Sequence, residues 1–190
     1  MEKQRLFVDM DGTLAVFIPV DTLETLYAPG YFENLPPIQN TVDAVKEIVQ
    51  NHPEIEVYIL SAVLSDSPYA LQEKKQWLDR YLPEVKSRIF MPCGEDKKAY
   101  IPEGIRRTDY LLDDYTVNLN RWEPPAKGIK LLNGINHTNG SWHGHRLRYD
   151  KPASVLADEI GSVMQGRIHA QDEKPQQTRH APDISGTVTY

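Results

Sequence analysis

The sequence predicts an α/β fold in which a parallel sheet of about five strands is covered by helices on both faces. Short apolar runs alternate with helical or looped segments along most of the chain, and this rhythm is typical of parallel sheets joined by crossovers. The helical segments carry single apolar stripes, as helices on the faces of a sheet do. With 190 residues and 40% hydrophobic composition, the chain has the size of one domain with its own core.

The predicted strands are the apolar runs Arg5 to Asp9, Glu56 to Ser61, Arg88 to Met91, Tyr110 to Asp113 and Gly128 to Leu132. Right-handed crossovers would make these strands parallel, so that their carboxyl ends meet at the same edge of the sheet. Ligands of open α/β sheets bind outside that edge. The polar residues that end each strand are therefore the first candidates for a functional site.

Three helices are predicted around this sheet. The first has Asn40 or Thr41 as its cap and ends at His52-Pro53. The second ends before Pro83, and the third runs from Ala153 to Met164. Their apolar faces are, in chain order, Val42, Val45, Ile48 and Val49; then Ala70, Leu71, Trp77, Leu78, Tyr81 and Leu82; and then Val155, Leu156, Ile160, Val163 and Met164. Trp77 is expected in the core rather than at a ligand.

Residues 1–167 are predicted to form the domain, and residues 168–190 a polar tail that is mobile or ordered by a partner, because the tail has no apolar period. The N-terminus passes from Met1 through charged residues into a strand without an apolar leader region. No stretch approaches the roughly 18 apolar residues of a membrane-spanning helix. A soluble, cytoplasmic protein that binds no membrane is therefore expected.

Charge and cysteine content narrow the classes of function. A net charge of -6 and a pI near 5.5 argue against binding of a nucleic-acid polymer, which needs clustered Lys and Arg, and leave a small charged metabolite as ligand. Cys93 is the only cysteine, and no helix start or base is evident beside it that would make it a catalytic thiol. The His-rich segment 136–145 is predicted to be a solvated loop rather than a second metal site.

The strongest chemical signal is a pair of carboxylates at the end of the first strand. Asp9 and Asp11 lie two positions apart where the strand gives way to Gly12-Thr13. Carboxylates crowded in this way repel each other and lose solvation, so a fold tolerates them mainly where a cation or a charged substrate offsets that cost. Mg²⁺ prefers such oxygen ligands. The alternative, in which the two acids only begin a turn at Gly12, is the weaker interpretation.

The segment Asp9-Met10-Asp11-Gly12-Thr13 resembles the first motif of the haloacid dehalogenase (HAD) superfamily. This resemblance implies a Rossmann-like HAD fold, catalysis through an aspartyl-phosphate, and Mg²⁺ as the cofactor. Asp9 would be the nucleophile and Asp11 the general acid and base. Asp9, the backbone carbonyl of Asp11, and Asp114 would hold Mg²⁺. The carboxylate of Asp11 separates the phosphatases of the superfamily from its dehalogenases.

Candidates for the three remaining motifs follow in order. Ser61 resembles the hydroxyl of the second motif and would, with Ala62, bind the phosphoryl group. Lys97 resembles the third-motif lysine that neutralises charge between the nucleophile and the phosphate, and Lys98 is its rival. Asp113-Asp114 resembles the acidic pair of the fourth motif. The second acid of this pair is the preferred metal ligand, and the first is an alternative or supporting one.

Within the superfamily, the chain up to about Met164 is most similar to the 5'(3')-deoxyribonucleotidases. The similar segments are Phe32 to Pro37, Leu60 to Ala62, Lys74 to Trp77, Leu112 to Tyr115 with Asn118, Trp122, Gly128-Ile129, and Asn133-Gly134 through Trp142. This resemblance implies a phosphomonoesterase whose substrate is a nucleoside monophosphate.

The segment between the first motif and the first helix is shorter than in the well-studied members of that family. Residues 16–39 leave space for a loop or one short helix in place of a helical cap. Phe17, Tyr27, Tyr31 and Phe32 are candidate walls for a base. A reduced cap exposes the catalytic face, so larger phosphorylated substrates, or closure by another subunit of a homo-oligomer, also fit the sequence.

Two other classes of function compete with the nucleotidase. One is a phosphatase or phosphotransferase for another small phosphorylated metabolite, although the mutases of the superfamily usually bring a larger cap. The other is a non-catalytic module that binds a phosphorylated ligand through the same face. Asp11 argues against such a module, because a binding protein has no need of a general acid and base.

Overall fold

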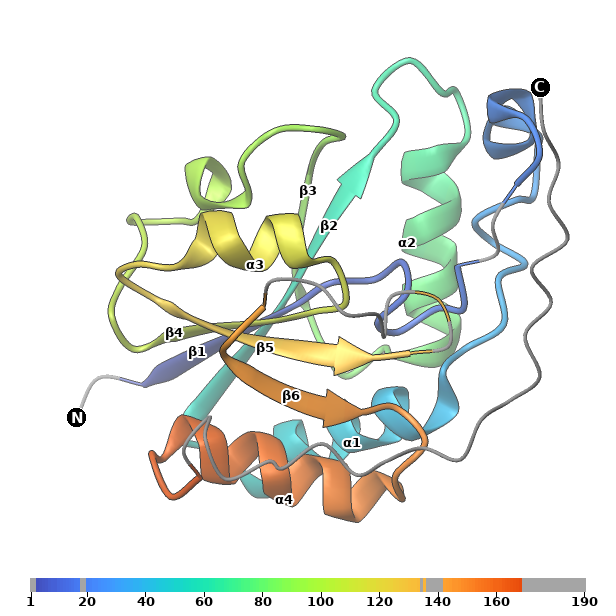
Figure 1. The fold of residues 1–190 in the computed structure, drawn as a ribbon. Coiled ribbons are helices and arrows are strands. Elements are labelled where there is room, and N and C mark those ends of the chain that lie inside the picture. The colour runs from blue at the N-terminus through green and yellow to red at the C-terminus, as the bar shows by residue number, and fades with distance from the viewer. Residues whose placement is uncertain (1–2, 18–19, 134, 136–141, 169–190) are drawn as a thin grey trace, which may run out of the picture.

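The computed structural model describes residues 3–17, 20–133, 135 and 142–168. Its six described strands form a sheet in the order β3-β2-β1-β4-β5-β6, in which all neighbours are parallel (Figure 1). The strands are β1 Gln4–Val8, β2 Ile55–Val63, β3 Ser87–Pro92, β4 Asp109–Asp113, β5 Lys127–Leu132 and β6 His145–Arg148. The predicted α/β fold with a parallel sheet is confirmed, and each of the five predicted strands is present.

The prediction of about five strands missed β6. This strand has four residues at the edge of the sheet, and only Leu147 among them is buried. It pairs with Ile129 to Leu132 of β5. A strand with one buried apolar side chain has no hydrophobic run, so its pattern does not distinguish it from a loop. The sheet therefore extends one strand further than the sequence indicates.

Four α-helices and two 3₁₀ helices accompany the described strands. They are α1 Gln39–Asn51, α2 Ala70–Tyr81, α3 Thr116–Trp122 and α4 Ala153–Met164, with the 3₁₀ helices η1 Leu23–Tyr27 and η2 Lys97–Tyr100. The third predicted helix has the bounds of α4, whereas α3 was not predicted. The predicted cap of α1 is wrong, because the N-cap is Ile38 and both Asn40 and Thr41 lie inside the helix. None of the helices that the structure describes is long and apolar enough to span a membrane.

Two predicted helix faces contain a residue that the structure exposes. Leu71 in α2 is 41% exposed, and Val155 in α4 is 42% exposed. Each is one position, or about 100° of rotation, away from a buried neighbour. The buried stripe of α2 instead includes Glu73 and Lys74 beside Trp77. A prediction from apolar residues alone therefore missed two charged residues on the buried face of this helix.

The sheet separates two hydrophobic cores. On one face, Leu6 and Val8 of β1 pack with residues of α1, α2 and α4. On the other face, Phe7 packs with Leu119 and Trp122 of α3. Figure 1 shows α3 on one side of the sheet and α1 with α4 on the other. Because alternate residues of a strand point to opposite faces, β1 is buried on both sides, and its carboxyl end emerges at the centre of the sheet.

Residues 16–39 leave the sheet after β1 and return to begin α1. The Ile38 N–H donates to the carbonyl of Leu14 at 2.7 Å, so the two ends of this segment lie together. Of its described residues, those of η1 are helical and residues 29–34 form turns. Trp77 of α2 is fully buried and donates from Nε1 to the carbonyl of Leu35 at 2.7 Å, which places it in the core as expected.

Candidate active site

Three buried carboxylates meet at the carboxyl ends of two neighbouring strands. Asp9 directly follows β1, Asp113 ends β4, and Asp114 follows it. One oxygen atom from each lies within 4.8 Å of the others. The exposed fractions are 7% for Asp9, 0% for Asp113 and 3% for Asp114. The parallel pairing of β1 with β4 thus brings together acids from distant parts of the sequence.

Lys97 lies between two of these acids. Its Nζ donates to Asp9 Oδ1 at 2.6 Å, to Asp113 Oδ2 at 2.7 Å and to the carbonyl of Leu60 at 3.1 Å. The lysine begins η2, which follows β3, and its side chain is buried. Of the two adjacent lysines that the sequence left open, Lys97 is the one whose ammonium contacts Asp9, whereas Lys98 is partly exposed.

The charges of this cluster shift each other's pKa values. Burial raises the pKa of the Asp9 carboxyl, Lys97 lowers it in part, and the neighbouring carboxylates, Asp113 foremost, keep it well above its ordinary value. Burial lowers the pKa of Lys97, but the charges of Asp113 and Asp9 raise it by more, so it lies above its ordinary value. One ammonium therefore serves two carboxylates, and the negative charge that it does not balance favours a cation beside Asp9.

The two adjacent acids of the fourth motif differ in their surroundings, and Asp113 is held entirely by the protein. Its Oδ2 accepts from Lys97 and, at 2.9 Å, from Nδ2 of Asn118. Its Oδ1 accepts from the backbone N–H of Tyr115 at 2.8 Å. Both carboxylate oxygens are thus used to fix neighbouring groups. This arrangement suits a residue that positions Lys97 better than one that binds a metal ion.

Asp114, in contrast, lines a pocket together with Asp9. Its Oδ2 accepts from Nδ2 of Asn133 at 2.8 Å. Gly12, with φ of +81°, packs against the same carboxylate, since a Cβ at this position would lie 2.3 Å from Asp114 Oδ2. Carboxylate oxygens are the donors that Mg²⁺ prefers. Asp9 and Asp114 therefore fit the expected ion, whereas the backbone carbonyl of Asp11 stays a predicted ligand.

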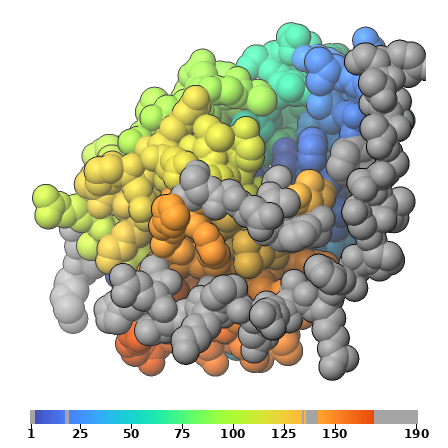
Figure 2. All heavy atoms as spheres, in the orientation of Figure 1, coloured from blue at the N-terminus to red at the C-terminus, as the bar shows by residue number. Residues whose placement is uncertain are grey.

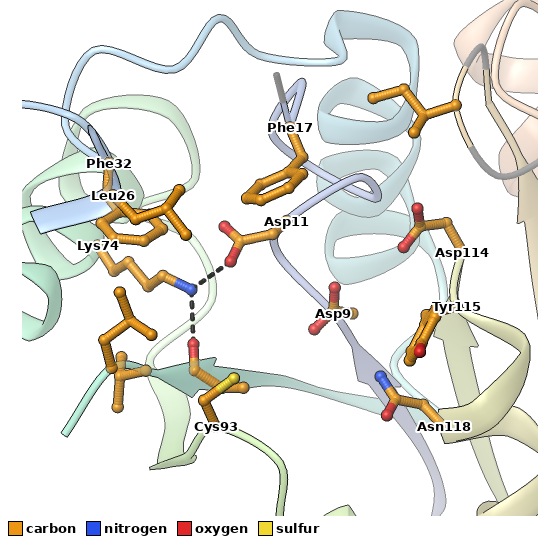
Figure 3. A pocket seen from close by; sticks show the side chains of 14 residues that line it. Asp9, Asp11, Phe17, Leu26, Phe32, Lys74, Cys93, Asp114, Tyr115 and Asn118 are labelled. Carbon is orange, nitrogen blue, oxygen red and sulfur yellow. Dashed lines mark hydrogen bonds and ion pairs between the residues drawn. The ribbon is translucent and has the colours of Figure 1, made fainter. Parts of the chain in front are cut away.

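Asp11 contacts a second buried lysine that the sequence did not assign to the site. Lys74 Nζ of α2 donates to Asp11 Oδ2 at 2.5 Å (Figure 3). It also donates to the carbonyl of Ala62 at 2.6 Å and to Ser61 Oγ at 3.1 Å. The Phe32 ring lies 4.8 Å from the same ammonium. Asp11 Oδ1 is buried and has no hydrogen-bond partner among the described residues. Asp11 is thus oriented through one oxygen.

The helix pattern contains a signal for Lys74. It lies four positions after Ala70 and three before Trp77, so all three share one face of α2, and that face is buried. A lysine on a buried helix face needs a partner with negative charge.

Ser61 is fully buried and contacts this lysine, while residues 62–64 line the pocket. The expected role of Ser61 in binding phosphate stays a prediction.

The site opens into a pocket of about 480 Å³. Its charged end is formed by Asp9, Asp11, Lys74 and Asp114; the other lining residues are Phe17, Leu26, Phe32, Ala62, Val63, Leu64, Cys93, Tyr115, Asn118 and Ile135. Figure 3 shows Asp9 and Asp11 between Phe32 on one side and Tyr115 on the other. In Figure 2, the darkest blue residues lie in a hollow between the yellow and the lighter blue surfaces. The pocket therefore combines one charged end with a largely apolar wall.

Two of the four aromatic residues expected as walls line the pocket, namely Phe17 and Phe32. Tyr27 instead donates from its hydroxyl to Asp66 Oδ1 at 2.9 Å. Tyr31 packs edge-on against both phenylalanines, with ring centroids 6.4 Å from Phe17 and 4.9 Å from Phe32. The tyrosines therefore support the wall rather than form it.

The remaining candidates fall at the rim of the site or outside the described residues. Cys93 is an exposed free cysteine that lines the pocket. Residues 136–141 of the His-rich segment and the tail from residue 169 lie outside the described residues, so the predictions for them stay predictions. His145 was expected in a loop, but it begins β6.

Comparison with known proteins identifies relatives of this chain. The family model described as 5' nucleotidase, deoxy (pyrimidine), cytosolic type C protein matches residues 19–147. The human 5'(3')-deoxyribonucleotidase, cytosolic type, is 30% identical over 108 residues, which are 56% of this chain and 49% of the human protein. A protein of Vibrio phage KVP40 named "Putative 5'(3')-deoxyribonucleotidase" is 28% identical over 130 residues, 62% of this chain and 69% of its own. The match thus spans about half the length of the human relative.

A solved structure has a similar fold. The crystal structure of D,D-heptose 1,7-bisphosphate phosphatase from Burkholderia thailandensis matches with a TM-score of 0.57 and 13% identity, over 83% of this chain and 99% of that one. At this identity the likeness concerns the fold alone, and it agrees with the predicted Rossmann-like α/β fold. The sequence matches confirm the resemblance to the deoxyribonucleotidases.

Proposed function

Because the chain belongs to the family described as 5' nucleotidase, deoxy (pyrimidine), cytosolic type C protein, we propose that it is a magnesium-dependent phosphomonoesterase that acts through an aspartyl-phosphate. The proposed reaction is that of a 5'(3')-deoxyribonucleotidase, which removes phosphate from a nucleoside monophosphate. The observation that carries the proposal is that Asp9 and Asp11 face one pocket beside Asp114 while Lys97 holds Asp9. The proposed location is the cytoplasm, as in the name of the human relative, which is of cytosolic type.

In the first step, a carboxylate oxygen of Asp9 would attack the phosphorus atom, and the bond from phosphorus to the sugar oxygen would break. Asp11 would give its proton to that departing oxygen. Lys97 fixes the Asp9 carboxylate through Oδ1 at 2.6 Å and offsets the negative charge that gathers as the phosphate approaches. The first step would leave the phosphoryl group on Asp9 and release the nucleoside.

In the second step, a water molecule would attack the phosphorus of the aspartyl-phosphate. Asp11, now ionised, would accept the proton of that water, and the bond from Asp9 to phosphorus would break to release inorganic phosphate. The contact of Lys74 with Asp11 Oδ2 at 2.5 Å orients this carboxylate at the charged end of the pocket. The same side chain can serve both steps because each leaves it in the protonation state that the other needs.

The acids of the site would also hold Mg²⁺ in this proposal. Asp9, Asp114 and the backbone carbonyl of Asp11 would be its protein ligands, and Asp113 would keep Lys97 in place. When bound, Mg²⁺ supplies a Lewis acid that offsets the charges of the nucleophile and the phosphoryl oxygens. Support for this assignment is the burial of Asp9 and Asp113 around a single contacting ammonium.

The pocket supports a substrate with one phosphate and a planar apolar part. Lys74 is the only cationic side chain among the described lining residues, and it already contacts Asp11. Phe17 and Phe32 provide aromatic surface on which a base can pack. A volume of about 480 Å³ is typical of sites for small molecules. These features favour a nucleoside monophosphate over a sugar with two phosphates.

The test is phosphate release from 5' and 3' ribo- and deoxyribonucleoside monophosphates, sugar phosphates and an aryl phosphate, with and without Mg²⁺. We expect magnesium-dependent release that is greatest with deoxynucleotides and is lost in Asp9→Asn. Activity on sugar phosphates alone, or transfer to another acceptor, would indicate a different metabolite phosphatase or phosphotransferase. Binding without release would indicate a phospholigand-binding module. A homo-oligomer stays a prediction that the proposed chemistry does not require.

A further inference from the structure

We propose that Asn133 is a positioning residue that aligns the two metal-binding segments of the site. The proposal rests on the proposed function, because it concerns the magnesium site of Asp9, Asp11 and Asp114. Asn133 directly follows β5, whereas the segments that it joins follow β1 and β4. Its side chain connects the end of β5 to the site.

The side chain of Asn133 bridges the two segments directly. Its Nδ2 donates to Asp114 Oδ2 at 2.8 Å and to the backbone carbonyl of Gly12 at 2.7 Å. Its Oδ1 accepts from the backbone N–H of Ile135 at 2.9 Å. The side chain is buried, with 5% exposed. Because the amide oxygen is held by its own loop, both amide hydrogens point toward the metal-binding segments.

Asp114 has little freedom at this position. Its carboxylate packs so closely on Gly12 that a Cβ there would lie 2.3 Å from Oδ2, and Asn133 donates to the same oxygen. Gly12 follows Asp11, whose carbonyl is the proposed backbone ligand. A single amide thus sets the spacing between that peptide and the Asp114 carboxylate. Loss of the amide would let both segments move.

The chemistry of the amide also matters. Asp113 is held by the ammonium of Lys97, which cancels charge as well as fixing geometry. Asn133 contacts Asp114 Oδ2 through a neutral amide, which orients the carboxylate and adds no charge of its own. A carboxylate that keeps its charge is the better ligand for a divalent cation. The adjacent acids thus have partners suited to their two different roles.

The test measures Mg²⁺ binding by calorimetry, without substrate, in the full chain and in Asn133→Ala and Asn133→Ser. We expect the dissociation constant for Mg²⁺ to rise by roughly 10- to 100-fold in both variants, the range seen when residues that orient metal ligands are removed. Asn34→Ala is the matched control, because Asn34 also donates from Nδ2 to a glycine carbonyl, at 2.7 Å, but in the segment before α1. Its Mg²⁺ affinity should equal that of the wild type.

A second readout separates positioning from a purely structural role. The unfolding midpoint of each variant is measured without Mg²⁺ and with saturating Mg²⁺, and the Asn133 variants should gain less from the ion. A lower midpoint with unchanged Mg²⁺ affinity would overturn the inference and leave the proposed function standing. A wild type that releases phosphate but binds no Mg²⁺ would overturn both the metal site and this role of Asn133.

Discussion

The charged end of the pocket, called its floor below, and the segment that forms its aromatic wall are held by different interactions. On the floor, Lys97 contacts Asp9 at 2.6 Å and Lys74 contacts Asp11 at 2.5 Å, and both lysines are buried. These groups follow or pack against strands at the centre of the sheet. The floor is thus fixed by short contacts from two buried ammonium groups to carboxylates that line the pocket.

In the wall, residues 16–39, a carboxylate of α2 binds two backbone N–H groups. Glu73 is buried, and it accepts from the N–H of Gly30 at 2.5 Å and from the N–H of Phe32 at 3.0 Å. The next residue, Lys74, lies under the Phe32 ring and contacts the floor. Changes in the floor should therefore alter the chemical step, and changes in the wall should alter substrate binding.

The largest effect is expected from Asp9→Asn. The amide has nearly the shape of the carboxylate but is a poor nucleophile, so kcat should fall by at least about 10⁴-fold. The measurement is phosphate release at saturating deoxynucleotide and Mg²⁺, with the unfolding midpoint as the control for folding. Activity within tenfold of the wild type would mean that another residue attacks phosphorus.

Lys97→Ala should give the next largest effect. It removes the positive charge beside the nucleophile, so kcat should fall by roughly 10²- to 10³-fold. It also leaves Asp9 and Asp113 buried without their ammonium, which should lower the free energy of unfolding by about 3–5 kcal/mol in the absence of Mg²⁺. Both quantities come from steady-state kinetics and denaturant unfolding of the same preparation.

Lys98→Ala is the matched control for that variant. Lys98 is adjacent in sequence and partly exposed, so its removal should change kcat by less than about twofold, as for most surface substitutions. If Lys98→Ala were the inactive variant, the assignment of the third motif to Lys97 would be wrong.

The parts of the floor that the sequence predicted are those whose residues lie close together in the chain. Asp9 and Asp11 follow an apolar run within one short segment, and Asp113-Asp114 follows another, so the parallel sheet implied that the two groups meet. The contact of Lys74 with Asp11 was not predicted, because it depends on which face α2 buries. The choice between Lys97 and Lys98 likewise needed the direction of η2.

The sequence predicted the long strands and most helices, but it missed the edge strand β6 and the short helix α3. The five long strands and α4 have clear apolar patterns, whereas β6 has one buried apolar residue and α3 has seven residues. Asn133 joins groups more than a hundred positions apart, as its contact with Gly12 shows, and no periodicity in the sequence encodes such a pairing. Local pattern therefore determines which elements form, and tertiary packing determines which polar side chains meet.

Phe17→Ala tests the wall from inside the pocket. Loss of its ring should raise KM for a deoxynucleotide by roughly tenfold, which corresponds to the free energy of one aromatic contact. It should leave kcat within about twofold of the wild-type value. Tyr27→Phe is the control, because it removes only a hydroxyl whose hydrogen bond is to Asp66, which does not line the pocket. A large fall in kcat with unchanged KM would show that Phe17 acts on the chemical step instead.

Glu73→Gln tests the hydrogen bonds that hold the wall against α2, and it should have the smallest effect. The amide keeps one acceptor oxygen but loses the charge that strengthens two backbone hydrogen bonds, so KM should rise by about threefold with kcat nearly unchanged. Glu33→Gln is the control within the same segment, since Glu33 makes a half-exposed ion pair with Arg80 that should contribute little. If Glu73→Gln lowered kcat as much as Lys97→Ala does, the wall would control the position of Lys74 and Asp11, and the two regions would form one unit.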